Sequence, residues 1–141
     1  MAIEVLTNAY VFINSVDLSD HVSKVTLEHS ADVLEATVMG DTGKRRLAGL
    51  KDWSATVEFR QDFASGKVDA TIFPLVGAAQ FPVAIKKDKT AAISATNPEF
   101  QGNAVIDGNY SPVNAGVGDL HNTSVKLVGA DGVALVRDVT Q

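Results

Sequence analysis

Apolar and polar residues alternate with a period of two along much of this chain, and this alternation limits the folds open to it. The clearest segment is residues 53–60, in which Trp53, Ala55, Val57 and Phe59 are separated by polar residues. Successive side chains of a strand point to opposite faces of a sheet. The segment therefore predicts a strand with one buried face and one solvent-facing side.

The same period recurs in short runs that are separated by turn residues such as Asp107-Gly108. These runs are rich in the β-branched and aromatic side chains typical of strands. The expected strands are residues 10–14, 24–29, 33–38, 53–60, 81–86, 91–96, 103–107 and 124–128. We therefore expect a mainly β fold of two packed antiparallel sheets, a β-sandwich or barrel of about eight strands.

One segment departs from the alternation. Residues 68–79 place apolar side chains at helical spacing, with Asp69 near the start. Pro74 lies inside this segment and removes a backbone hydrogen-bond donor. The sequence predicts one short helix that flanks the sheets.

A long inter-strand loop is expected at residues 39–52, which have no clear period. Loops of this length are usually functional or disordered. Leu47 and Leu50 lie among its charges, which argues against simple disorder. The segment also holds four of the chain's twelve basic residues, Lys44, Arg45, Arg46 and Lys51, next to the only tryptophan. We expect an arm that folds against another surface.

Composition limits the function classes. The 141 residues, 45% of them hydrophobic, are expected to form one domain, 1–141, with its own core. The absence of cysteine excludes disulfides, thiolate metal sites and cysteine nucleophiles. A formal net charge of −5 argues against a dedicated nucleic-acid binder. No signal peptide or membrane-spanning segment is recognisable, so we expect synthesis in a cytoplasm and no membrane insertion.

Motifs for catalysis or ligand binding are absent. The fragment Gly40-Asp-Thr-Gly-Lys44 lacks the spacing of a phosphate-binding loop. His21 and His29 lie near Asp17 and Asp20, but polar residues at the rim of a hairpin explain this grouping better than a metal site. No nucleophile elbow and no histidine pair at i, i+4 occurs. The sequence predicts no enzymatic activity, no cofactor and no metal.

The order of several short motifs resembles that of the major tail tube proteins of long-tailed (siphovirus-type) bacteriophages. The resemblance covers nearly the whole chain. The motifs are Val16-Asp-Leu-Ser-Asp-His-Val22, Glu35-Ala-Thr37, Met39-Gly-Asp41, Leu47-Ala-Gly-Leu50, Lys51-Asp-Trp-Ser54, Gly66-Lys-Val-Asp69, Thr96-Asn-Pro98, Tyr110-Ser-Pro112 and Gly116-Val-Gly-Asp119. The resemblance implies two packed β-sheets with a flanking helix, in agreement with the alternation.

The resemblance also implies a structural role. Hexameric rings of such subunits stack into a hollow tube that conducts the DNA genome from capsid to host. The implied partners are further copies of the chain, a tape-measure protein, a tail terminator and distal tail or baseplate proteins. The implied location is the virion tail, after assembly in the host cytoplasm. Residues 39–52 match a loop that reaches the neighbouring ring.

This role suggests a reason for the basic cluster. Lysine–phosphate contacts would slow DNA in a channel, whereas an acidic lumen would keep the duplex centred. We therefore expect the basic side chains to meet acidic residues of an adjacent subunit, with apolar neighbours buried in the contact. The expected contact residues are Lys44, Arg45, Arg46, Leu47, Leu50 and Trp53. The residues expected to face the lumen, on the polar sides of strands, are Thr26, Glu28, Thr56 and Glu58.

Two other interpretations remain at this point. A tube protein of a contractile tail or of a type VI-like injection system would use nearly the same chemistry. A monomeric β-sandwich that binds carbohydrate would need exposed aromatic side chains on one face.

Overall fold

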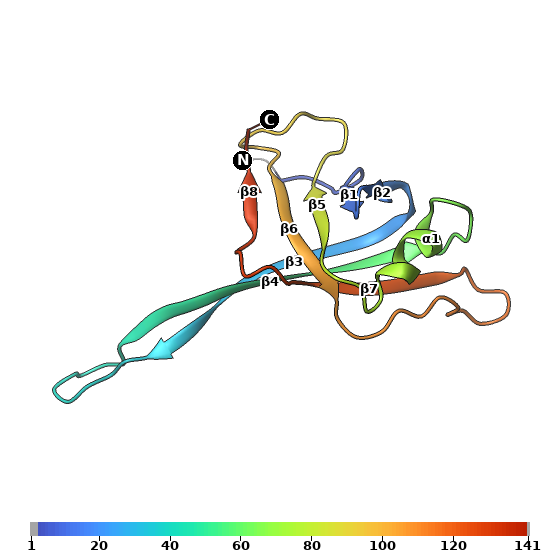
Figure 1. Cartoon of the computed structure of the whole chain (residues 1–141). Helices are drawn as coiled ribbons and strands as arrows, with labels where there is room; N and C mark the ends of the chain where they lie inside the picture. Colours follow the sequence, from blue (N-terminus) through green and yellow to red (C-terminus); the bar gives the residue numbers. More distant parts are fainter. Residues whose placement is uncertain (1–2, 141) are drawn as a thin grey trace.

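The structure is a computed structural model that describes residues 3–140 (Figure 1). Its strands are β1 (Tyr10–Ile13), β2 (Val16–Asp17), β3 (Val22–Glu35), β4 (Arg46–Arg60), β5 (Phe81–Lys86), β6 (Glu99–Ile106), β7 (Asn122–Gly129) and β8 (Val136–Asp138). Its helical segments are η1 (Ser19–His21), α1 (Val68–Ile72) and η2 (Phe73–Leu75). The domain expected at 1–141 includes residues 1, 2 and 141, which lie outside the described residues.

The strands form one antiparallel sheet in the order β2-β1-β5-β6-β7-β4-β3, and β8 pairs with β6. The predicted mainly β fold with one short α-helix is confirmed. The two expected layers are parts of a single sheet, which bends so that β1 and β5 share one core with β4 and β7. β6 joins the two halves. The sandwich-like packing therefore comes from one sheet folded on itself.

The core contains the apolar side of the predicted alternation. Ala55, Val57 and Phe59 of β4 are fully buried, and the residues between them are exposed. They pack in one cluster with side chains of β1, β5 and β7, among them Ile13 and Leu127. Fully burying one large apolar side chain contributes about 1.5–3 kcal/mol, so this cluster supplies the main stabilisation.

The helix is shorter than predicted. α1 buries Val68, Thr71 and Ile72 and ends at Ile72, and Pro74 lies in the following 3-10 turn, η2. Proline has no backbone N–H, so it cannot continue the α-helical hydrogen bonds. The expected helix at 68–79 is therefore two short helical turns that cover the core with Val68 and Leu75.

The strand expected at 91–96 does not form. This segment is a loop around Asn97, which is 4% exposed. The Asn97 Nδ2 donates to the carbonyl oxygens of Asp88, Ala91 and Ala92, each at 3.2 Å. One buried amide side chain thus satisfies backbone carbonyls that a strand would have paired in a ladder.

The β3–β4 hairpin is the longest feature of the fold. Its pairing runs from Val22↔Phe59 to Glu35↔Arg46, so the connecting loop is residues 36–45 rather than 39–52. The outer half of the hairpin, residues 31–51, extends beyond the core in Figure 1 and is called the arm below. Half of the expected loop residues, 46–52, therefore belong to β4.

Candidate subunit interface

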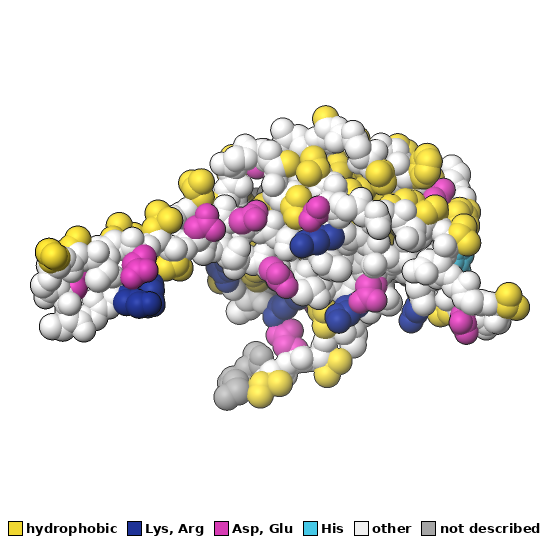
Figure 2. All heavy atoms as spheres, turned by 90° about the horizontal axis from the view of Figure 1, so that it is seen from below, with side chains coloured by type: hydrophobic (Ala, Val, Ile, Leu, Met, Phe, Trp, Pro, Cys, Tyr) yellow, Lys and Arg dark blue, Asp and Glu magenta, His cyan; other side chains and the backbone are white. Residues whose placement is uncertain are grey.

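The arm exposes apolar side chains, some of which are visible in Figure 2. Leu34 lies opposite Leu47, and Val33 lies opposite Ala48. Because neighbouring side chains of a strand point to opposite faces, each face of the arm carries one of these apolar pairs. Leu34 and Leu47 are 57% and 59% exposed, and Leu50 is 83% exposed. Exposed apolar surface of this kind makes the arm a candidate contact surface for another protein.

Four apolar residues of the arm were not among the expected contact residues. They are Val33, Leu34, Val38 and Met39, and each is more than half exposed. Val33, Leu34 and Val38 lie in the strand expected at 33–38, and Met39 lies in the loop expected at 39–52. The adjacent apolar pair Val33-Leu34 is the local signal of a strand that is apolar on both faces, whereas Val38 and Met39 lie in the connecting loop.

The tip of the arm is ordered by local hydrogen bonds. Asp41 accepts a hydrogen bond from the Val38 backbone N–H at 3.0 Å, and the Arg45 N–H donates to the Thr37 hydroxyl at 2.9 Å. Gly40 adopts a φ of 94°, a conformation that favours glycine. The tip is thus a defined turn, which holds its side chains in place for a contact.

The basic residues lie together on the arm, but they differ in whether an acidic residue of the same chain lies beside them. Arg45 forms an ion pair with Asp41 at 2.8 Å, and Arg46 lies opposite Glu35 in the strand register. Among the ion pairs of residues 3–140, none includes Lys44. Part of the positive charge is therefore offset within the arm itself.

Trp53 lies in the core of its own chain. The expectation that its side chain is buried against a second subunit is therefore corrected. Its side chain is 3% exposed. Gly102 of β6 and Gly129 of β7 form a slot for the indole, because a Cβ at either position would lie about 2.5 Å or less from the ring. A side chain held this way within the sheet leaves no surface for a partner.

The residues expected to face a lumen lie on one polar face of the sheet. Thr26 pairs with Thr56, and Glu58 pairs with Lys24, so the face continues from β3 to β4. It extends to β7, where Lys126 lies opposite Thr56. Two lysines, Lys24 and Lys126, thus accompany Glu28 and Glu58. This face carries mixed charge, in contrast to the acidic lumen expected of a channel that conducts DNA.

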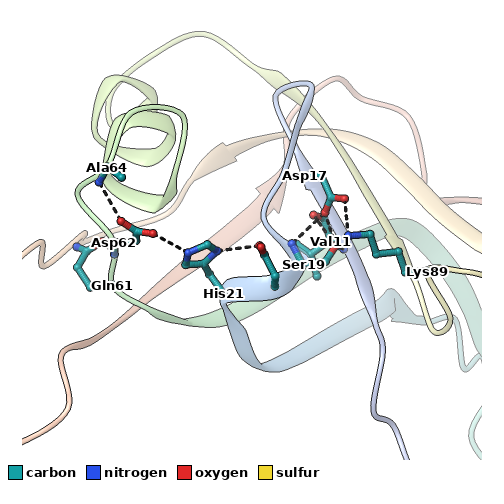
Figure 3. A network of polar contacts seen from close by, with 9 residues as sticks. Val11, Asp17, Ser19, His21, Gln61, Asp62, Ala64 and Lys89 are labelled. Atoms are coloured by element: carbon teal, nitrogen blue, oxygen red, sulfur yellow. Dashed lines mark hydrogen bonds and ion pairs between the residues drawn. The ribbon is translucent and has the colours of Figure 1, made fainter.

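A polar network ties η1 to the segment between β4 and α1 (Figure 3). The His21 Nδ1 lies 2.8 Å from Asp20 Oδ1, and its Nε2 lies 2.7 Å from Asp62 Oδ2. An imidazolium would donate to both carboxylates. Among residues 3–140 no group of three or more His, Cys, Asp or Glu side chains is placed to hold a metal ion. The network is a structural tie between two loops.

Acidification below about pH 4 is expected to weaken this tie. The pKa of Asp20 is lowered chiefly by its hydrogen bond with His21, and that of Asp62 chiefly by the Ala64 N–H and then by His21. A folded-state pKa below the unfolded value stabilises the fold above the unfolded pKa, and this contribution is lost as pH falls through the folded pKa. Thermal unfolding of wild type and of an Asp20→Asn, Asp62→Asn variant at pH 6 and pH 3 measures it. The variant should lose less stability on acidification, and equal losses would contradict this role.

No protein-family model and no curated protein sequence matches this chain. Solved structures do share its fold. A chain from the virion of the native gene transfer agent (GTA) particle superposes with a TM-score of 0.66 at 12% identity, covering 92% of this chain and 95% of that chain. A chain from the six-fold symmetrised baseplate of the anti-feeding prophage (AFP) gives 0.63 at 13% identity over 100% of both chains.

A third structure is the tail of an empty GTA particle with C6 symmetry. One of its chains superposes with a TM-score of 0.60 at 11% identity, covering 83% of this chain and 81% of that chain. Identities this low establish the fold and nothing more. This chain therefore has a fold that occurs in a virion, a tail and a baseplate. Within residues 3–140, no helix is both long enough and apolar enough to span a membrane.

Proposed function

We propose that this chain is a structural subunit of a phage-type tail tube, in which hexameric rings stack into a hollow tube that conducts DNA. The arm is the observation that carries the proposal, because it projects from a closed core with six large apolar side chains exposed. The shared fold with a chain of a C6-symmetric tail supports the same role. In a tube the arm would be covered by neighbouring copies.

The energetics favour assembly through many copies of a modest contact. Burying six such side chains would contribute on the order of 10 kcal/mol at about 1.5–3 kcal/mol each. Association costs about 4–15 kcal/mol in lost freedom of the subunits. The free energy gained in one arm contact is therefore close to the cost of association. A subunit that makes several such contacts in a ring is bound much more tightly. Assembly should depend steeply on protein concentration.

The proposed partners are further copies of the chain, a tape-measure protein, a tail terminator and distal tail or baseplate proteins. The proposed location is the virion tail, after assembly in the host cytoplasm. The role needs no catalysis and no cofactor, and DNA would pass through the lumen without specific binding.

A tube protein of a contractile or injection-type particle is the second candidate, and the likeness to a chain of the AFP baseplate favours it. A carbohydrate-binding module has less support. The rings of Tyr10 and Phe12 stack on each other at 5.7 Å, and the Lys86 Nζ lies 5.3 Å from the centre of the Tyr10 ring. These two rings are thus in contact with other side chains of the chain.

Sedimentation velocity over a wide concentration range tests the proposal. A subunit of a tube should convert from a 14.9 kDa monomer to very large particles above a threshold concentration. A chain that stays monomeric at every concentration, also when purified with its proposed partners, would contradict the role.

Reversing the basic charges of the arm should raise that threshold, and added salt should then lower the threshold of the variant, because salt screens the new repulsion from acidic partner residues. The variant replaces Lys44, Arg45 and Arg46 with Glu. Its effect on monomer stability should be small, because Arg45 is 60% exposed in its pair with Asp41 and surface pairs contribute about 0.2–1 kcal/mol. Sedimentation of wild type and variant at low and high salt measures the shift. If the variant assembles normally, these charges do not contact an adjacent subunit.

The polar face around Thr26, Glu28, Thr56 and Glu58 is proposed to line the lumen. Because the chain has no cysteine, Glu28→Cys and Glu58→Cys each introduce a single thiol. A polyethylene-glycol maleimide should label both variants readily before assembly and at least ten-fold more slowly in assembled tubes. Each unassembled variant serves as its own control. Equal labelling rates before and after assembly would place this face on the outside.

A further inference from the structure

The end of the body opposite the arm carries a second exposed apolar surface. Its members come from the segment after β4 and from the loop at 107–121 between β6 and β7, and they are Phe63, Val113, Val117 and Leu120, which are 55%, 76%, 109% and 65% exposed. The ring of Phe63 lies 5.6 Å from that of His121, next to Leu120. Figure 1 places this loop at the end of β7, away from the arm. We call these four residues the end patch.

Hydrogen bonds hold the start of the loop at 107–121 against the body, although this loop has no regular secondary structure. Gln61 Nε2 donates to Tyr110 Oη at 2.9 Å and to the Pro112 carbonyl at 2.8 Å. Tyr110 Oη donates to Asp69 at 2.8 Å, and Thr123 donates to the Ser111 carbonyl at 2.9 Å. Burial, together with the bond to Asp69, raises the pKa of Tyr110 to about 12, so this donor stays protonated. These bonds attach residues 110–112 to the body, and within the loop the Asn114 N–H donates to His121 Nε2 at 3.2 Å.

The two ends of the chain also differ in charge. Residues 36–46 at the tip of the arm carry three basic and one acidic side chain. Residues 60–69 and 107–121 around the end patch carry four acidic and two basic side chains. Among the ion pairs of residues 3–140, none includes Asp119, which precedes Leu120. Lys44 on the arm and Asp119 at the end patch are thus complementary charges beside apolar surface.

We propose that the arm of one copy docks on the end patch of a second copy. The arm points away from its own end patch, so the partner must be another molecule (Figure 1). Because the two surfaces are different, the contact is head-to-tail and repeats in one direction instead of closing as a two-fold dimer. This inference rests on the proposed function and names the surface that receives the arm.

Mixed single-cysteine variants test the contact in a chain with no other thiol. Met39→Cys or Leu47→Cys on the arm is mixed with Leu120→Cys, assembled and oxidised. The yield of disulfide-linked dimer should be at least ten-fold higher in this mixture than in a control mixture in which Thr56→Cys, an exposed site on the polar face, replaces Leu120→Cys. A second measurement uses Leu120→Asp, which should raise the assembly threshold at least ten-fold. The matched variant Val133→Asp, at a residue 59% exposed outside both surfaces, should not.

The outcomes separate this inference from the proposed function. Tubes that form without the Leu120 disulfide and with an unchanged threshold in Leu120→Asp overturn the docking site and leave the tube role standing. End-to-end chains that cross-link through Leu120 but never form hollow rings support the docking site and overturn the tube role. A protein that neither cross-links nor assembles overturns both.

Discussion

Replacing Trp53 with alanine should lower the free energy of unfolding by about 3–5 kcal/mol. The indole is 3% exposed and fills a slot between β4, β6 and β7, so its removal leaves a cavity in the middle of the sheet. Small domains have a total free energy of unfolding of about 5–15 kcal/mol, so this single change removes a large part of it. Urea unfolding followed by circular dichroism measures the difference.

The two glycines of the slot give this prediction a stringent control. An added Cβ would lie 2.5 Å from Trp53 at Gly102 and 2.4 Å from it at Gly129. Gly102→Ala should therefore destabilise the wild type by about 1–3 kcal/mol through overpacking. In the Trp53→Ala background the cavity accepts the methyl group, so the same change should cost much less. Additive effects in this double-mutant cycle would show that indole and glycine do not share the slot.

Replacing Leu47 and Leu50 with serine should abolish assembly while leaving the monomer intact. Both side chains are more than half exposed, so the free energy of unfolding should change by less than about 0.5 kcal/mol per substitution. If both leucines are buried in the contact, their loss costs about 3–6 kcal/mol per arm. Since about 1.4 kcal/mol is a factor of ten, the threshold for assembly should rise more than 100-fold.

The matched control is Phe73→Ser, which removes an apolar side chain that is 63% exposed and lies outside the arm and the end patch. Thermal unfolding and sedimentation of the three proteins separate folding from assembly. The control should assemble like the wild type. Normal assembly of the leucine variant would mean that the arm is not a subunit contact.

Most of the core could be predicted from the sequence because its signal is local. The alternation at 53–60 identified the buried face of β4, and the limits of β5 agree with the predicted strand. The first strand of the arm was expected at 33–38, but its second strand, from Arg46, was assigned to the loop 39–52 because that segment shows no period of two. The segment 91–96 has strand-like residues, but the hydrogen bonds of Asn97 hold it in a loop.

Part of the candidate interface could be predicted because its signal is also local in the sequence. Its charged residues and leucines are neighbours in the sequence, so a local cluster pointed to them. The position of Trp53 depends on Gly102 and Gly129, which are about 50 and 75 residues away in the chain and give no local signal. The end patch joins residues from two separate segments, 63 and 113–120, which only the folded chain brings together.

Electron microscopy of the purified chain above its assembly threshold tests the central claim most directly. A tail tube subunit should give end-on views with six-fold symmetry around a central hole wider than a DNA duplex, and side views with a regular axial repeat. Solid filaments, rings of another symmetry or closed dimers would contradict the tube.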